Sequence, residues 1–211
     1  MTDRLSLYNG ALLECGERDL ASLTEAREPR RLLDRVWDNG AVDYCLWQGQ
    51  WAFARRSTQL APSASVTPGF GHSHAYLQPT DHIRTISLTT DEYGKVPLLD
   101  YVPEGDYWYT DAEPIYLSYV SNHASYGGDL TRWTAEFVRA VECYLAARII
   151  KKLTQSEDKE AAMEKKAAML FMRAASGDAM ENPTKFPPSG SWVNSRRGSG
   201  GDRGKRSRLI G

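Results

Sequence analysis

An apolar residue at every fourth position constrains the fold of this chain more than any other sequence feature. The repeat consists of Phe137, Val141, Leu145, Ile149 and Leu153. Because side chains four positions apart lie on the same face of an α-helix, this spacing predicts a helix over residues 133–153. One face of that helix is expected to be buried in the core, so the fold must supply neighbours to cover it.

The same periodicity predicts three more helices, over residues of about 5–15, 28–48 and 157–176. Gly16 is suited to cap the first helix, and Pro29 to begin the second because a first-turn residue needs no N–H group. Asn39-Gly40 is the point where the second helix would bend or break. Ser156 is suited to cap the last helix, which a short connection joins to helix 133–153 as an antiparallel hairpin.

Residues of about 51–120 are instead rich in β-branched and aromatic residues separated by turn residues. Strand-forming runs cover Trp51–Leu60, His82–Thr89, Leu98–Val102, Tyr107–Thr110 and Ile115–Val120. Their tight spacing and the turn residues between the last three runs predict an antiparallel meander rather than parallel crossovers. The predicted fold is therefore α+β and mainly α, an antiparallel helical bundle with an inserted small antiparallel β region.

The chain divides into an expected body, residues 1–177, and an extended basic tail, residues 178–211. Residues 189–211 contain six Lys or Arg and one Asp, a net charge of +5, whereas residues 1–188 contain 20 basic and 26 acidic residues, a net charge of −6. Asn194–Arg208 has no aliphatic or aromatic side chain. Such a segment cannot offset its conformational entropy by burial, so on its own it is expected to be disordered.

Two apolar islands, Trp192-Val193 and Leu209-Ile210, flank this polar run. As a protein anchor, the tail would fold onto an acidic or grooved partner through these islands and its arginines. As a nucleic-acid binder, its cations would neutralise phosphates without sequence preference. The islands favour the anchor, since a solubilising tail does not need them. The predicted partner-binding residues are Trp192, Val193, Arg196, Arg197, Arg203, Lys205, Arg206, Arg208, Leu209 and Ile210.

A metal-dependent enzyme is a third hypothesis, and it rests on histidine. His72 and His74 would face the same side of a strand, and His82 and His123 would complete a metal site. Against this, neighbouring glycine, serine and proline residues place the pair in a loop, and no HExxH-like spacing accompanies it. No nucleophile elbow, Walker-type loop or dinucleotide-binding glycine motif is present. We therefore expect a non-enzymatic protein with no catalytic residue, metal or cofactor.

The remaining polar and cysteine residues suggest no chemistry. Glu142 and Arg148 are expected on the solvated face of helix 133–153. The three cysteines form no CxxC pair, which favours a reducing compartment over a disulfide framework. The longest uncharged run, Ser57–Thr80, is too rich in proline, glycine and hydroxyl groups to span a membrane, so no membrane association is expected.

A series of short motifs occurs in a fixed order along the body. They are Gly49–Ala54, Phe70-Gly71 running to Ala75-Tyr76, Pro79, Asp81-x-x-Arg84, the Tyr-rich Ile115–Val120, Leu145–Arg148, and Asp178-Ala179 after the last helix. Over residues of about 5–180, this order resembles the head-to-tail connector or adaptor proteins of tailed double-stranded-DNA bacteriophages. The tail tubular protein A group of short-tailed phages is included. The order and spacing carry the resemblance more than any single motif.

The resemblance implies a structural virion protein, made in the host cytoplasm and located at the head–tail interface. It implies a ring of about twelve copies beneath the portal, which extends the DNA channel toward the tail. The implied partners are the portal protein, a tail or nozzle protein below, other copies of the chain, and DNA that passes without sequence-specific binding. In such relatives the C-terminal segment reaches onto the portal, and acidic residues facing the lumen would let DNA phosphates slide past.

Overall fold

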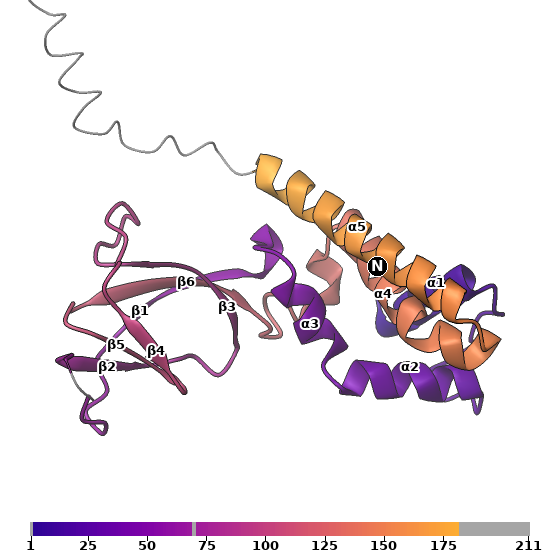
Figure 1. The fold of residues 1–211 in the computed structure, drawn as a ribbon, viewed down its shortest axis with the longest axis horizontal. Coiled ribbons are helices and arrows are strands. Elements are labelled where there is room, and N and C mark those ends of the chain that lie inside the picture. The colour runs from indigo at the N-terminus through magenta and orange to yellow at the C-terminus, as the bar shows by residue number, and fades with distance from the viewer. Residues whose placement is uncertain (1, 69–70, 182–211) are drawn as a thin grey trace, which may run out of the picture. The chain divides into compact units, whose positions relative to one another are not determined.

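The structure is a computed structural model that describes residues 2–68 and 71–181. These residues form an α+β fold with five α-helices and two small antiparallel sheets, as the predicted class requires (Figure 1). The helices are α1 (Arg4–Cys15), α2 (Glu28–Asp38), α3 (Ala41–Trp47), α4 (Ala135–Thr154) and α5 (Glu157–Glu181). The strands are β1 (Arg55–Leu60), β2 (His74–Leu77), β3 (His82–Thr89), β4 (Val102–Glu104), β5 (Tyr107–Thr110) and β6 (Ile115–Ser121).

Local capping explains where the first helix begins and ends. The Asp3 carboxylate accepts a hydrogen bond from Ser6 N at 2.7 Å, and Ser6 Oγ accepts one from Asp3 N at 2.9 Å, which forms a capping box. Gly16 has a φ of 75°, and its N–H group bonds to the carbonyls of Leu12 and Leu13. The predicted C-cap is confirmed, and glycine suits it because a side chain disfavours this left-handed conformation.

The helix predicted over residues 28–48 is broken at Asn39-Gly40, the point where the sequence indicated a bend or break, so a single helix over this range is wrong. The chain forms two helices, α2 and α3, separated at Asn39-Gly40. Gly40 has a φ of 84°, a left-handed conformation that cannot continue a right-handed helix. Pro29 lies in the first turn of α2, as predicted. The break turns α3 away from α2, so that α3 contacts β3 and β6 as well as α4.

The last helix is longer than predicted and moves the boundary of the body. α5 continues through residue 177 and ends at Glu181, so the expected start of the extended tail at residue 178 is wrong. Asp178 is on the helix, not after it. Its carboxylate accepts a hydrogen bond from Ala52 N, with distances of 2.9 and 3.1 Å to its two oxygens. This tertiary contact stabilises a helix end whose sequence alone gives no reason for it to persist.

The strands form two sheets rather than the predicted meander. One sheet has the order β1-β6-β3, and the other has the order β2-β5-β4. Only β4 and β5 are neighbours in both the sequence and a sheet, so most pairings are non-local. The strands predicted at His82–Thr89, Tyr107–Thr110 and Ile115–Val120 are confirmed, the last with one more residue, whereas the strand predicted at Leu98–Val102 is β4, Val102–Glu104. A second core cluster draws on both sheets and contains Tyr76, Leu88, Trp108, Ile115, Leu117 and Tyr119.

The predicted strand from Trp51 begins only at Arg55, because residues 52–54 form a 3-10 turn. The Trp51 side chain is buried, and its Nε1 donates a hydrogen bond to Leu46 O at 3.0 Å. A β-carbon at Gly49 would lie 2.7 Å from the Trp51 ring, closer than packing allows. The Gly49-Gln50-Trp51 motif therefore has a structural meaning, since only glycine lets the indole lie against the backbone.

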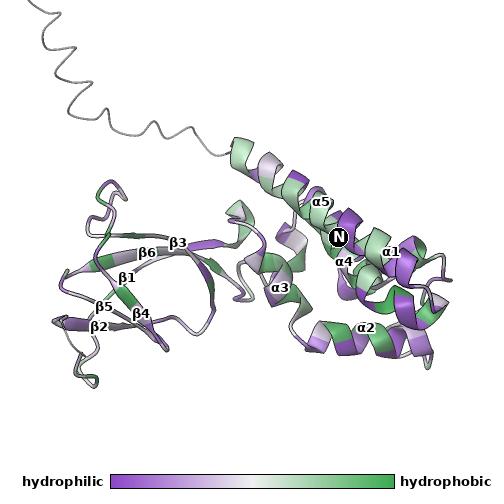
Figure 2. Ribbon diagram, viewed as in Figure 1, coloured by the Kyte–Doolittle hydropathy of each residue, from purple (hydrophilic) through white to green (hydrophobic). Residues whose placement is uncertain are grey.

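The principal core is organised around α4. Phe137 at its start contacts the rings of Trp51, Trp133 and Phe171, with centroids 4.7, 4.9 and 6.2 Å away. The predicted stripe through Ile149 is buried. α5 packs along α4 after a connection of two residues, and α1 packs on it as well. Figure 2 shows hydrophilic and hydrophobic residues alternating along these helices, as expected when one face of each is covered.

The sheet β1-β6-β3 is held by a carboxylate that precedes β3. Asp81 accepts hydrogen bonds from Arg56 Nη1 at 2.8 Å, from Tyr119 Oη at 3.1 Å and from Ser121 Oγ. Its side chain is 12% exposed. Burial raises the pKa of Asp81, but the hydrogen bonds from Ser121, Arg56 and Tyr119 outweigh burial and leave that pKa below its usual value. The carboxylate therefore stays charged and connects β1 and β6 to the start of β3.

We predict that Asp81→Asn lowers the free energy of unfolding at neutral pH by about 2 kcal/mol, because three hydrogen bonds lose their charged acceptor. A carboxylate with a lowered pKa stabilises the fold above the ordinary aspartate pKa and loses this contribution as the pH falls through its folded-state pKa. The difference between the variant and the wild type should thus shrink in acid. Urea unfolding at several pH values measures the difference, with exposed Asp19→Asn as the control. A difference that does not change with pH would contradict the role of the charge.

Candidate interaction surfaces

The residues predicted to bind a partner all lie in the tail. Trp192, Val193, Arg196, Arg197, Arg203, Lys205, Arg206, Arg208, Leu209 and Ile210 are outside the described residues. The predictions for them stay predictions.

His82 and His123 lie in surroundings of their own, apart from His74, and Asp111 is close to both His72 and His74. His74 begins β2, a strand that the sequence did not predict, and its Nε2 lies 3.5 Å from Glu113 Oε2. His82 packs against the rings of Trp108 and Tyr119, and burial lowers its pKa. Nδ1 of His123 accepts a hydrogen bond from the backbone of the following turn. His82 and His123 thus have local partners of their own.

Within residues 2–68 and 71–181, no group of three or more His, Cys, Asp or Glu side chains is arranged to hold a metal ion. The structure therefore lends no support to the metal-site hypothesis at His72 and His74. The cysteines are reduced, and burial raises the pKa of Cys15 and of Cys143 to about 11. Their thiols are protonated at neutral pH and are poor nucleophiles. In the described part of the chain, no helix is long and apolar enough to cross a membrane.

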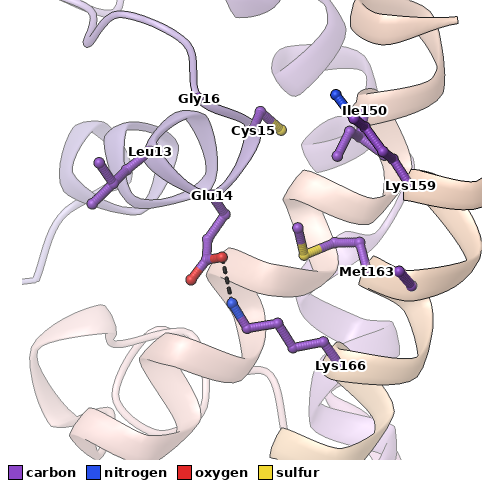
Figure 3. A pocket seen from close by; sticks show the side chains of 9 residues that line it. Leu13, Glu14, Cys15, Gly16, Ile150, Lys159, Met163 and Lys166 are labelled. Carbon is purple, nitrogen blue, oxygen red and sulfur yellow. Dashed lines mark hydrogen bonds and ion pairs between the residues drawn. The ribbon is translucent and has the colours of Figure 1, made fainter. Parts of the chain in front are cut away.

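An open groove of about 450 Å³ lies between the end of α1 and the start of α5 (Figure 3). Its lining combines Leu13 and Met163 with an ion pair in which Lys166 Nζ lies 2.5 Å from Glu14 Oε2. This pair joins α1 to α5 across the groove, as the dashed line in Figure 3 shows. Its charged groups therefore hold two helices together, and nothing else in the groove points to a particular ligand.

Glu142, expected on the solvated face of its helix, is instead half-buried between α4 and α1. A β-carbon at Gly10 would lie 2.3 Å from the Glu142 carboxyl carbon, so this side chain occupies the space that the glycine leaves open. Burial, and to a lesser degree the charge of Glu14, raise the pKa of Glu142 above its usual value. Arg148 is exposed, as predicted.

We predict that Glu142→Gln raises the thermal midpoint at pH 7. A carboxyl group with a raised folded-state pKa binds its proton more tightly in the folded chain, so it lowers stability as the pH rises above the ordinary glutamate pKa. The gain should therefore vanish near pH 4. Thermal unfolding followed by circular dichroism at both pH values tests this, with exposed Glu164→Gln on α5 as the control. Equal effects of the two substitutions would show that burial of Glu142 is not the cause.

A cluster on α3, β3 and α4, the aromatic–arginine patch, comprises Tyr44, Trp47, Arg84, Tyr144 and Arg148. Tyr44, Trp47 and Arg148 are exposed, and Arg84 and Tyr144 are partly buried. Tyr44 and Trp47 are one helical turn apart, and they are 49% and 56% exposed. The Tyr44 ring stacks on Tyr144 of α4 at 4.7 Å. The Arg84 guanidinium lies 5.4 Å from the Trp47 ring, and its Nη1 donates to Trp47 O at 3.1 Å. Arg148 follows Tyr144 by one turn, so two cations flank three aromatic rings.

A second exposed surface, the acidic strip, spans residues 91–113 from the end of β3 through β5. It contains seven carboxylates and one lysine, a net charge of −6 that equals the whole net charge of residues 1–188. Six of the seven carboxylate residues are exposed. Among them are the apolar side chains of Tyr93, Val96 and Leu99, which are 74%, 53% and 86% exposed. The strip therefore offers both charge and apolar area to a partner.

The motifs that carry the phage-adaptor resemblance lie mostly where helices meet strands. Trp51 and Ala52 contact α3 and α5, and Asp81 binds β1 and β6. Arg84 reaches the last residue of α3. Phe70 lies outside the described residues. Most of these residues connect the two halves of the fold, whereas Arg84 and Arg148 also belong to the aromatic–arginine patch.

Sequence reasoning missed both exposed surfaces, although each left a signal. Tyr44 and Trp47 fall outside the apolar stripe of their helix, and large aromatic residues outside a stripe are candidates for exposure. The acidic strip has a net charge of −6 within 23 residues, but the prediction used only the net charge of the whole body. A sliding count of net charge along the chain would have found it.

Comparison with models of known protein families and with curated protein sequences finds no match to this chain.

Proposed function

We propose that this chain is a structural component of a tailed-phage virion, a head–tail adaptor that forms a ring beneath the portal and extends the DNA channel. In this proposal the helices form an antiparallel bundle, and the tail binds the portal protein. The ring of about twelve copies follows from the resemblance alone. DNA passes through the lumen, and a tail or nozzle protein binds the opposite side of the ring.

One observation supports this proposal most directly. The small body carries two exposed surfaces of opposite character, the aromatic–arginine patch and the acidic strip, in addition to a tail with a net charge of +5. Three separate surfaces exceed what a chain with one partner needs. They suit a subunit that contacts neighbouring copies and other components at the same time.

The chemistry of the tail supports its assignment to the portal. Arginine side chains form paired hydrogen bonds with carboxylates, and tryptophan and branched aliphatic residues fill apolar pockets. Both are present between residues 189 and 211, where Trp192 and Ile210 lie on either side of the basic run. A tail that only bound phosphate would need the cations but not these apolar residues.

We predict that deletion of residues 189–211 leaves a folded body that no longer co-purifies with portal oligomers. The body should keep its circular dichroism spectrum and thermal midpoint because the deletion removes none of the described residues, which form both core clusters. Co-purification with an assembled portal, detected by gel filtration, measures the loss. Undiminished portal binding by the truncated chain would contradict the anchor assignment.

A second variant separates the anchor from a nucleic-acid role. Replacement of Trp192, Val193, Leu209 and Ile210 by alanine keeps all six tail cations. If the tail is an anchor, this variant should lose portal binding as the deletion does. If the tail binds nucleic acid, the variant should still retard duplex DNA, with an affinity that falls linearly on a double-logarithmic salt plot. Retained portal binding by the alanine variant would overturn the role of the apolar islands.

A further inference from the structure

We infer that the aromatic–arginine patch of one copy binds the acidic strip of the next copy, so that the two surfaces form a head-to-tail contact. The inference rests on the proposed adaptor function, which requires a repeated contact between copies. Beyond that function, the inference names the two surfaces through which neighbouring copies bind each other. Both surfaces belong to the described residues, and neither includes the tail.

The composition of the patch is that of a binding hot spot. Trp, Tyr and Arg are the residues most enriched where truncation costs the most affinity in protein interfaces. Trp47 is 56% exposed, so more than half of its indole would be desolvated only by a partner. The stacking of Tyr44 on Tyr144 and the position of Arg84 over Trp47 hold these side chains in place. A pre-ordered patch loses less side-chain entropy on binding.

The acidic strip complements this patch in both charge and polarity. Its exposed carboxylates include Asp100 and Glu104, and its apolar side chains include Leu99, which is 86% exposed. On the patch side, Lys152 follows Arg148 by one helical turn and extends the row of cations on α4. Carboxylates can thus pair with guanidinium and ammonium groups while apolar side chains cover the aromatic rings.

The two surfaces belong to different parts of the fold. Arg84 lies near the start of β3, where it contacts α3, whereas the strip begins after Thr89 at the other end of that strand and continues into β4 and β5 of the second sheet. Five residues of strand separate Arg84 from the start of the strip by about 15 Å. The Leu98 N–H group bonds back to Leu88 O, which keeps the following segment at that far end. Two different patches on one subunit are what a heterologous, ring-forming contact requires.

This assignment competes with the expectation that acidic residues line the channel. The strip holds the entire net negative charge of residues 1–188, and the remainder of the body is neutral overall. The same carboxylates cannot both pair with a neighbouring copy and face DNA. The contact between copies is favoured here because the strip also exposes apolar side chains, which a DNA-facing surface does not need.

Sedimentation velocity of the protein alone, without portal, tests the inference. The full-length wild type should self-associate, and Trp47→Ala should weaken that association about 30-fold. Arg148→Glu with Lys152→Glu should be monomeric, as should Asp100→Lys with Glu104→Lys. A mixture of these two charge-reversed variants should associate again, because each restores the pairing that the other lost. Arg173→Glu, an exposed charge reversal on α5, should have no effect.

The outcomes separate this inference from the proposed function. Association that survives every variant would place the contact on another surface and overturn the inference, while portal co-purification could still succeed. A wild type that stays monomeric up to about 1 mM would also overturn it, since a contact that weak does not hold a ring. If each charge-reversed variant is monomeric and their mixture is monomeric too, charge pairing between copies is excluded. If each variant is monomeric alone but the two associate when mixed, the inference is supported.

Discussion

A largely buried carboxylate holds the sheet β1-β6-β3 together, and an arginine three residues later links that sheet to α3. Asp81 accepts hydrogen bonds from β1 and β6, while Arg84, three residues later, donates to the last residue of α3. A charge with 12% of its side chain exposed would be costly without partners, and three donors compensate for this cost. Because both interactions converge at the start of β3, the sheet β1-β6-β3 and α3 are fixed to each other.

The helical part was largely predictable because its signals are local. The four-residue repeat of α4 and the caps at Gly16 and Pro29 depend on residues a few positions apart, and the structure contains them. The break at Gly40 was marked by Asn-Gly, but the apolar pattern continued across it and favoured one helix. The extension of α5 to Glu181 was not predictable, since it depends on the hydrogen bond between Ala52 N and Asp178, 126 residues apart.

The arrangement of the sheets, unlike that of the helices, could not be predicted from local sequence patterns. Strand-forming runs were visible, but a meander was the simplest arrangement of them, and the structure instead pairs β1 with β6 and β2 with β5. Such pairings depend on which side chains meet in the interior, as Tyr76 and Trp108 do, and no local pattern specifies this. β2 was missed because its four residues lie among glycine, serine and proline. The exposed surfaces were missed for a related reason, since exposure depends on what the rest of the fold leaves uncovered.

Both the interior contacts and the exposed surfaces matter for the proposed assembly. A ring closes only if each copy is turned from the last by a constant angle, so the two contacting surfaces must be fixed rigidly relative to each other. The aromatic–arginine patch is built on α3, α4 and the start of β3, and the acidic strip on the segment after β3 together with β4 and β5. The contacts of Asp81, Arg84 and Trp51 are among those that connect these regions through the interior. Most of the motifs that resemble phage adaptors therefore act, in this proposal, by fixing the angle between subunits, whereas Arg84 and Arg148 also belong to the patch that binds the next copy.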